Sequence, residues 1–489
     1  MIKINVTKIP NALDAINDIC FSKHFKRLSD KTQMIETRIS EHYRTRLTHT
    51  LEVMSIANTI CDKLNYFLND EYLELNVDKN IVIATSLGHD LGHTPYGHIG
   101  EQVIRELLED TGYLFKHNIN SIKILLEENK RSSRNPLEIY PYNIDWQIID
   151  GILKHTKVFS KPYTGDLSDP YYLDGYFKNH PVFANKDFQL YIKEFLNAGD
   201  NSTFLNSYLN YSYPLTLSGQ IIAVADEIAQ RISDFDDTIR ILKKRNYKRI
   251  ASAGIFKNLV KKIKDVYNEL NEIDESKRTK TCKSTINYCH HILKLLDEAK
   301  KNDELSFINI INRTQNFYIE NLVENIKDKI LTNLKYQTLT INYDDAKIEK
   351  NINYYLIKSI DDNQFIYFDE FVEKIRKSMS NFSYKNVHNS KEIEKGNSEG
   401  KKNIKKWFNY CMSNFDLCDN KVKRRLIQLY TNTYGKDNYG YTIKDVIDKF
   451  NNNDDIQFIN KCKLIVLEGI SYMSNNYLSN KVYDFEKNI

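Results

Sequence analysis

Apolar residues recur at helical spacing along most of this 489-residue chain. Residues 46–64, RLTHTLEVMSIANTICDKL, place their apolar side chains at the spacing of one face of an α-helix. Residues 80–91, NIVIATSLGHDL, predict a second apolar helix, and residues 99–112 a third that ends at a glycine cap. Residues 217–240 predict a long amphipathic helix. The pattern therefore predicts an all-α fold.

Helix-breaking residues are scarce, with 16 Gly and 8 Pro in the whole chain, which favours long helices over many turns. Residues 1–35 predict short helices. Residues 160–185, rich in Tyr, Pro and Gly, predict a long loop, and residues 388–403, HNSKEIEKGNSEGKKN, a flexible segment. A small β-hairpin over residues 335–360 is the only strand structure that we expect.

We expect the chain to divide into three consecutive parts. The first, residues 1–41, is an N-terminal helical segment that completes the active site. The second, residues 42–245, is the core that carries it, and the third, residues 246–489, is a helical region that contributes to the substrate pocket and to oligomerisation.

Composition is that of an ordinary soluble protein, with 41% hydrophobic and 27% charged residues. No apolar run is long enough to predict a membrane span, and the first residues lack the apolar stretch of a signal peptide, so we expect a cytoplasmic protein. The net charge of +4 neither indicates nor excludes nucleic-acid binding. The seven cysteines include no CxxC pair and are expected to be reduced. Cys282, Cys289, His290 and His291 lack the spacing of common structural zinc sites.

The histidines are concentrated in one part of the chain. Of the 12 in the sequence, seven fall within residues 42–155: His42, His49, His89, His93, His98, His117 and His155. Three of these lie in the short stretch SLGHDLGHTPYGHIGE, residues 86–101, together with Asp90 and Glu101. Such a concentration of ligand-type side chains indicates a site.

A metal site is the chemistry that this stretch favours. His89 and Asp90 are adjacent at a predicted helix end, where two neighbouring side chains can reach one ion. His49, on another predicted helix, can add an imidazole, and Asp226 in AVADEIA is the best candidate for a distant carboxylate. Two imidazoles and two carboxylates, with water in the open positions, suit Mn²⁺, Fe²⁺, Co²⁺, Ni²⁺ or Zn²⁺.

The order His49, His89–Asp90, Asp226 resembles the signature of the HD-domain metal-dependent phosphohydrolases. Further segments resemble, in family order, the motifs of the deoxyguanosine triphosphate triphosphohydrolase family. They are FKRLSDKTQMI (25–35), HYRTRLTHTLEV (42–53), LGHDLGHTPYGHIGE (87–101), FKHNINSIKIL (115–125), GILKHT (151–156), VADEIAQRISDFDD (224–237) and EGISYMSNNYLSNKVYDF (468–485).

This resemblance implies a helical HD-domain core and a reaction in which a dNTP, dGTP above all, and water give a deoxynucleoside and inorganic triphosphate. It implies that a divalent ion is held by the tetrad His49, His89, Asp90 and Asp226. The ion is Mn²⁺, Mg²⁺, Fe²⁺, Co²⁺, Ni²⁺ or Zn²⁺, which the sequence does not distinguish. In such a reaction, water attacks the α-phosphorus, and the leaving 5′-oxygen benefits from protonation.

The resemblance also assigns roles around the ion. His93 and Glu101 would flank the attacking water with His117 alongside, and His98 would lie near the scissile oxygen as a candidate general acid. How acid and base roles divide among these four residues is left open. Further from the ion, the candidate substrate-binding residues are Arg46 for phosphate, and Gln33 and Asp234 for the deoxyribose.

The chain departs from the family pattern at a few positions. Gln230 stands where the family usually has Tyr, which leaves the preferred base open, and Asn475 stands where the C-terminal motif has Asp. The insertion at residues 160–210 is long. These departures fall outside the predicted metal site, and we interpret them as altered specificity or regulation rather than lost activity.

Partners and alternatives follow from the same resemblance. It implies a homo-oligomer, a tetramer or hexamer, with a dNTP effector or single-stranded nucleic acid as a further ligand. The basic segments KKNIKKW (401–407) and KVKRRL (421–426) are more typical of solvated faces than of a nucleic-acid channel. Two alternatives remain: another HD-domain enzyme, such as a 5′-nucleotidase or phosphodiesterase, or a non-catalytic nucleotide- or nucleic-acid-binding oligomer.

Overall fold

The computed structural model describes most of the chain. It covers residues 12–33, 44–71, 77–128, 144–156, 189, 204–244, 256–299, 304–336, 366–388, 391–435, 440–452 and 455–487. Within these ranges the regular structure is helical, and the single extended pairing is an isolated bridge between Thr32 and Thr45. The predicted all-α fold is confirmed for the described part of the chain.

The strongest helix predictions are confirmed. Helices form as α3 (Arg46–Glu71), α4 (Lys79–Gly88), α5 (Gly97–Leu108) and α11 (Leu217–Lys244). The described part of the N-terminal segment forms the short helices α1 (Ala12–Phe21) and α2 (Lys23–Arg27). Helix α4 ends earlier than its apolar pattern suggests, so His89 and Asp90 lie in the turn that follows it.

One prediction is wrong: the segment at residues 388–403 was expected to be flexible, yet helix α18 (Lys391–Ser413) runs through most of it. Two packing contacts that the polar composition does not reveal hold this helix in place. Trp407, further along the helix, is buried in a hydrophobic core. Gly400 packs against Tyr96 so closely that an added Cβ would lie 2.6 Å from the ring. The predicted loop at 160–185 lies outside the described residues, as does the hairpin at 335–360 beyond the end of α15.

Contacts divide the chain into two compact units, each assembled from separate stretches. Unit 1 comprises Met1–Thr48, Leu87–Ser212 and Lys395–Ile489, and unit 2 comprises His49–Ser86 and Tyr213–Glu394. The division into three consecutive parts at residues 41 and 245 stays a prediction. Because the units interleave in sequence, residues from both ends of the chain meet in unit 1.

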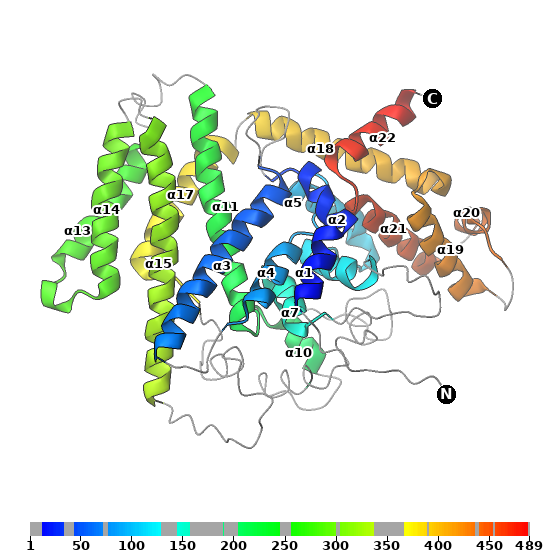
Figure 1. The fold of residues 1–489 in the computed structure, drawn as a ribbon. Helices are drawn as coiled ribbons and strands as arrows, with labels where there is room; N and C mark the ends of the chain where they lie inside the picture. The colour runs from blue at the N-terminus through cyan, green and yellow to red at the C-terminus, as the bar shows by residue number, and fades with distance from the viewer. Residues whose placement is uncertain are drawn as a thin grey trace, which may run out of the picture. The chain divides into compact units, whose positions relative to one another are not determined.

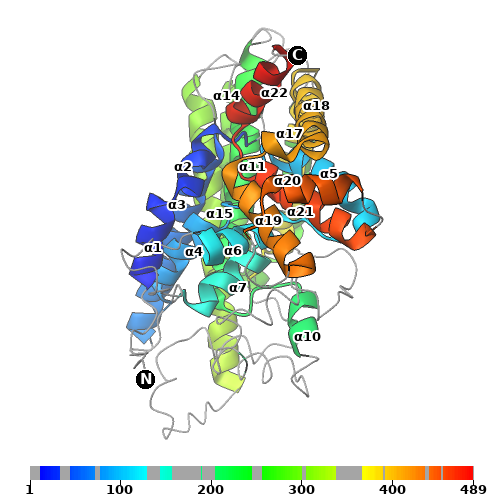
Figure 2. The same ribbon diagram turned by 90° about the vertical axis from the view of Figure 1, so that its right-hand side faces the viewer.

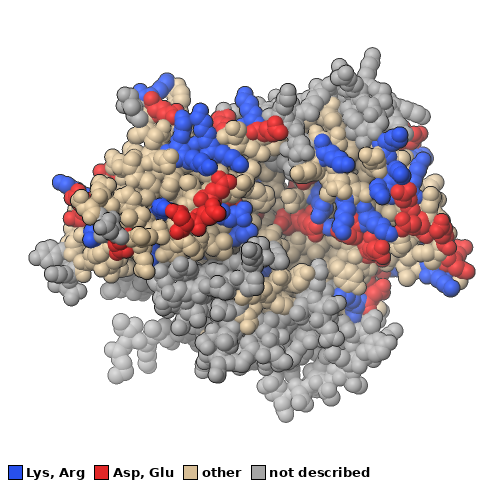
Figure 3. Space-filling model, turned by 180° about the vertical axis from the view of Figure 1, so that it is seen from behind, with Lys and Arg blue, Asp and Glu red and all other residues tan. Residues whose placement is uncertain are grey.

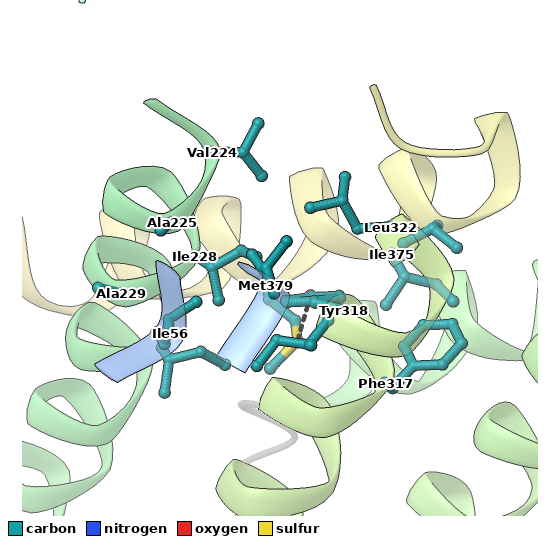
Figure 4. Close-up of a cluster of buried hydrophobic side chains, with 14 of the residues drawn as sticks. Ile56, Val224, Ala225, Ile228, Ala229, Phe317, Tyr318, Leu322, Ile375 and Met379 are labelled. Atoms are coloured by element: carbon teal, nitrogen blue, oxygen red, sulfur yellow. Dashed lines mark hydrogen bonds between the residues drawn. The ribbon is translucent and has the colours of Figure 1, made fainter. Parts of the chain in front are cut away.

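Unit 2 is a bundle built on long amphipathic helices. Besides most of α3 and α4 and all of α11, it holds α13 (Lys257–Glu272), α14 (Lys280–Ala299), α15 (Glu304–Tyr336) and α17 (Glu370–Ser383) (Figure 1). Its core joins Ile56 of α3, Ile228 of α11 and Ile375 of α17 (Figure 4). The hydroxyl of Tyr318 in α15 donates to the sulfur of Met379 at 3.2 Å within this cluster.

Unit 1 packs the C-terminal helices with α5. They are α18, α19 (Asn420–Tyr434), α20 (Ile443–Asn451), α21 (Ile456–Ser471) and α22 (Asn475–Lys487). Its other described helices include α6 (His117–Lys123), α7 (Trp146–Lys154) and α10 (Phe204–Asn210) (Figure 2). Val103 and Ile104 of α5 share a buried cluster with Ile465 of α21, so the core of unit 1 fixes the helix that carries His98 and Glu101.

Two features of the structure match expectations from the composition: the mixed charge of the surface and the character of the helices. On the face seen in Figure 3, basic and acidic side chains lie beside one another. Among the helices that the structure describes, none combines the length and the apolar character that crossing a membrane requires.

Candidate active site

The turn after α4 is folded around a close approach of α6. The hydroxyl of Ser121 donates to the carbonyl of His89 and accepts from the amide of Gly92, both at 2.8 Å. A Cβ on Gly92 would lie 2.2 Å from the carbonyl oxygen of His117, so a glycine is needed for this approach. Gly92 therefore allows the start of α6, with His117, to lie against the turn that carries His89 and His93.

Asp90 is the centre of a buried charge cluster. Its carboxylate accepts from Nη1 of Arg46 at 2.8 Å and lies 3.1 Å from Nε2 of His93 and 3.5 Å from Nε2 of His89. Burial opposes the charged form of Asp90, but His93, His89 and Arg46 outweigh it and hold its pKa well below the usual range. Burial and the charge of Arg46 hold the pKa of His93 well below its usual value. At neutral pH the cluster is therefore an ionised carboxylate with a neutral His93.

A second buried pair joins α5 to α6. Nδ1 of His117 lies 2.7 Å from a carboxylate oxygen of Glu101, and the Lys116 ammonium is 3.7 Å from the other. Burial alone would raise the pKa of Glu101. The hydrogen bond and the charge of His117 outweigh this effect and lower the pKa to about 2. The carboxylate is thus ionised at neutral pH and accepts the Nδ1 proton of His117.

His155, at the end of α7, continues this chain of rings. Its Nδ1 lies 2.7 Å from the carbonyl oxygen of Ile152, and a carbonyl can only accept, so the Nδ1 proton points there. In a neutral His155, Nε2 then has a lone pair, and it lies 3.4 Å from Nε2 of His117. Glu101, His117 and His155 form a continuous path for holding or moving a proton.

His93 and His98 complete the imidazole cluster. The rings of His93 and His117 stack with centroids 3.9 Å apart, and the His98 ring lies 5.2 Å from that of His93. His98 is exposed, unlike its neighbours, so it can meet a ligand. Burial of its ring, with Arg46 and His117, lowers its pKa to about 4. His98 is therefore neutral at pH 7.

The remaining predicted ligands lie in unit 2. Nε2 of His49 is 2.9 Å from Oδ1 of Asp226, and the His49 side chain is buried. The hydroxyl of Ser233 in α11 donates to Glu52 of α3 at 2.9 Å, which keeps the two helices in register. The structure thus brings His49 to Asp226 and His89 to Asp90.

The predicted sugar-binding residues have different settings. Gln33 follows the bridge at Thr32, and its Oε1 is buried without a hydrogen-bond donor among the described residues. Asp234 is half-buried on α11, two turns after Asp226. Gln33 therefore offers an acceptor for a ligand hydroxyl.

Two residues near the site were not assigned from the sequence. His155 has the contacts described above, and Lys31 is fully buried with its ammonium donating to the carbonyls of His93 and Ser471. Burial, with Arg27 and Arg46, lowers the pKa of Lys31 to about 7. Both residues lie in segments that resemble family motifs, His155 in GILKHT and Lys31 in FKRLSDKTQMI, but nothing in either segment indicates the contacts that these side chains make.

Features outside the site have structural explanations. All seven cysteines are free thiols, and no metal-type group in the described part of the chain includes the Cys282–His291 segment. Basic residues of the two Lys-rich segments pair with acidic ones at Lys405–Glu106, Lys406–Glu486, Lys423–Asp416 and Arg425–Glu468. The first three pairs support the solvated-face interpretation of those segments, whereas Arg425 pairs with a buried carboxylate.

Comparison with known proteins identifies the region that holds these residues. The HD domain family matches residues 46–231. A deoxyguanosinetriphosphate triphosphohydrolase-like protein of Bartonella quintana is 29% identical over 53% of this chain and 53% of its own length. One from Caldanaerobacter subterraneus is 34% identical over 45% of this chain and 44% of its own, so the chain spans about half of these relatives. A protein of the same description from Rickettsia akari is 25% identical over 90% of this chain and 88% of its own.

Proposed function

We propose that this chain, which belongs to the HD-domain phosphohydrolases and is similar to deoxyguanosinetriphosphate triphosphohydrolase-like proteins, hydrolyses dNTPs to deoxynucleosides and inorganic triphosphate. One observation carries the proposal. Asp90, His93, Glu101 and His117 are all buried in one cluster of unit 1. Burying so many titratable groups is costly, and such clusters are typical of active sites.

The donor groups fit a divalent ion. Imidazole nitrogens and carboxylate oxygens are the ligands that Mn²⁺, Fe²⁺, Co²⁺, Ni²⁺ and Zn²⁺ accept. His49 and Asp226 present one such atom each, 2.9 Å apart, and His89 and Asp90 present another two. We propose that these four residues hold one ion. When bound, such an ion polarises a phosphoryl oxygen and raises the acidity of water beside it.

Glu101 and His117 would handle the proton of the attacking water. Glu101 is ionised and accepts the Nδ1 proton of His117, so this pair is fixed in orientation before substrate binds. His155 offers its Nε2 lone pair to the other side of His117. In the proposed reaction, Nε2 of His117 takes the proton of the attacking water and donates it in a hydrogen bond to His155, while Glu101 balances the resulting charge.

His98 would protonate the leaving 5′-oxygen. It is exposed beside His93, and it is neutral at pH 7 in the absence of ligand because its pKa is about 4. A bound triphosphate brings negative charge, which raises the pKa of a neighbouring imidazole. Binding of the substrate would thus load His98 with the proton that the leaving group needs.

The other candidate residues would select the substrate. Arg46 has a planar guanidinium that can bridge phosphoryl oxygens while it stays paired with Asp90. Gln33 and Asp234 would face the deoxyribose. The dGTP preference rests on the names of the relatives, and Gln230, in place of the usual Tyr, makes the base preference a separate question. The proposal includes assembly into a homo-oligomer, which light scattering would measure.

Product analysis tests the proposal. The purified protein is incubated with each dNTP and with GTP, in Mn²⁺ or Mg²⁺, and phosphorus products are resolved by NMR. The variant with His89→Ala and Asp90→Ala runs in parallel. The expected products are deoxynucleoside and inorganic triphosphate, lost in the variant. Orthophosphate or pyrophosphate would identify another HD-domain phosphohydrolase instead, and absence of turnover with mixed dNTPs would identify a non-catalytic binding oligomer.

A further inference from the structure

The backbone at Tyr96 adopts a conformation that its side chain disfavours. Its φ is 60°, in the left-handed region, which residues other than Gly, Asn and Asp rarely adopt. Gly97 follows with a φ of 58°, and helix α5 starts there. Because His98 is the second residue of α5, the geometry at Tyr96 and Gly97 sets where the His98 ring points.

Asn475, the first residue of α22, holds this backbone through its side chain. Its Oδ1 accepts the amide N–H of Tyr96 at 2.9 Å, and its Nδ2 donates to the hydroxyl of Thr32 at 2.5 Å. Asn475 and Tyr96 are both buried, so water does not replace the bond easily. One amide thus ties together the N-terminal segment, the site turn and the C-terminal helix.

Neighbouring contacts hold the same turn from its other sides. The Tyr96 hydroxyl lies 2.7 Å from that of Ser479 and accepts from Nδ2 of Asn403 at 3.0 Å. At the other end of the turn, the ammonium of Lys31 donates to the carbonyls of His93 and Ser471. The path from His93 to His98 is therefore fixed at both ends by residues distant in sequence, and Asn475 holds its strained point.

We propose that Asn475 is a positioning residue, which fixes the left-handed turn at Tyr96 and thereby aims His98 at the leaving group. Its kinetic consequence rests on the function proposed above, but its structural consequence does not. A carboxylate could accept the same amide N–H and also the Thr32 hydroxyl proton. The geometry thus explains why Asn can stand where the family motif has Asp.

The variants follow from the two hydrogen bonds. Asn475→Leu removes both while it keeps the volume of the side chain, and Asn475→Asp keeps both. Asn476→Ala is the matched control, because the side-chain amide of Asn476 donates to Asp30 of the N-terminal segment at 2.6 Å rather than to the turn. Thr32→Val, which removes only the hydroxyl that orients the amide, serves if the Leu variant does not fold.

Two readouts separate this proposal from the proposed function. The first is hydrogen exchange at the Tyr96 amide, without metal or nucleotide. We expect exchange about tenfold faster in Asn475→Leu, a smaller acceleration in Thr32→Val, and wild-type rates in Asn475→Asp and Asn476→Ala. An unchanged rate in Asn475→Leu, or in Thr32→Val should the Leu variant not fold, would overturn the proposal whether or not the protein cleaves any dNTP.

The second readout is kinetic, on whichever dNTP the wild type cleaves. We expect kcat of Asn475→Leu to fall by about tenfold or more with KM little changed, because a misaimed acid slows chemistry rather than binding. Asn475→Asp should keep the wild-type kcat, because it keeps both hydrogen bonds. The positioning role would be overturned if the KM of Asn475→Leu rose by as much as its kcat fell. It would also be overturned if Asn475→Asp lost as much kcat as Asn475→Leu. If the wild type cleaves no dNTP, the proposed function fails while the exchange result still stands.

Discussion

Replacing Glu101 by Gln tests the charge balance of the buried pair with His117. Glu101 is 3% exposed, and its pKa is lowered from 4.5 to about 2. At about 1.4 kcal/mol for each pH unit, this difference contributes about 3 kcal/mol of folding stability at pH 7. Because the folded pKa is the lower one, the contribution exists above the unfolded pKa and is lost as the pH falls toward 2. Roughly 1.5 kcal/mol remains at pH 3.

The assay is urea unfolding followed by circular dichroism, in EDTA, at pH 7 and at pH 3. Glu101→Gln should lose about 3 kcal/mol at pH 7 and about half of that at pH 3. Glu106→Gln on the same helix is the matched control, because Glu106 pairs with Lys405 at the surface, and it should cost under about 1 kcal/mol. Equal costs for the two variants, or a cost for Glu101→Gln that does not depend on pH, would refute the reasoning.

Other predictions concern packing, a buried ion pair and the metal. Gly92→Ala should cost about 1–3 kcal/mol or more, because its Cβ would meet the α6 backbone at 2.2 Å, whereas Gly440→Ala, with nothing within 4 Å, should be neutral in the same unfolding assay. Glu468→Gln should cost about 3–5 kcal/mol, since Lys123 and Arg425 lose the buried carboxylate that they pair with at 2.8 and 2.5 Å; a cost under about 1 kcal/mol would contradict this. Chelation should abolish dNTP hydrolysis, and added Mn²⁺ should restore it; activity that persists in excess EDTA would exclude the metal site.

The helices of this chain could be predicted because their signal is local. The apolar spacing of residues 46–64 and 217–240 became α3 and α11, since an amphipathic stripe needs only neighbours on its own helix to be recognised. The segment at 388–403 was wrongly predicted to be flexible because the signal for its helix is not local. Its composition is polar, and the contact that orders it, Gly400 against Tyr96, joins residues far apart in sequence.

The site shows the same limit. His89, Asp90, His93, His98 and Glu101 stand in one stretch, so their proximity could be predicted from spacing alone. The orientation of their protons could not, because it depends on a carbonyl at Ile152 and on a chain of hydrogen bonds through α6 and α7. Buried partners of this kind leave no periodic or compositional trace.

The position of bond cleavage tests the central claim most directly. The protein is incubated with dGTP and Mn²⁺ in water enriched in oxygen-18, and the products are separated and analysed by mass spectrometry. Attack at the α-phosphorus predicts inorganic triphosphate that carries one heavy oxygen, together with unlabelled deoxyguanosine. Labelled orthophosphate with dGDP, or labelled pyrophosphate with dGMP, would place the attack at another phosphorus and would contradict the account.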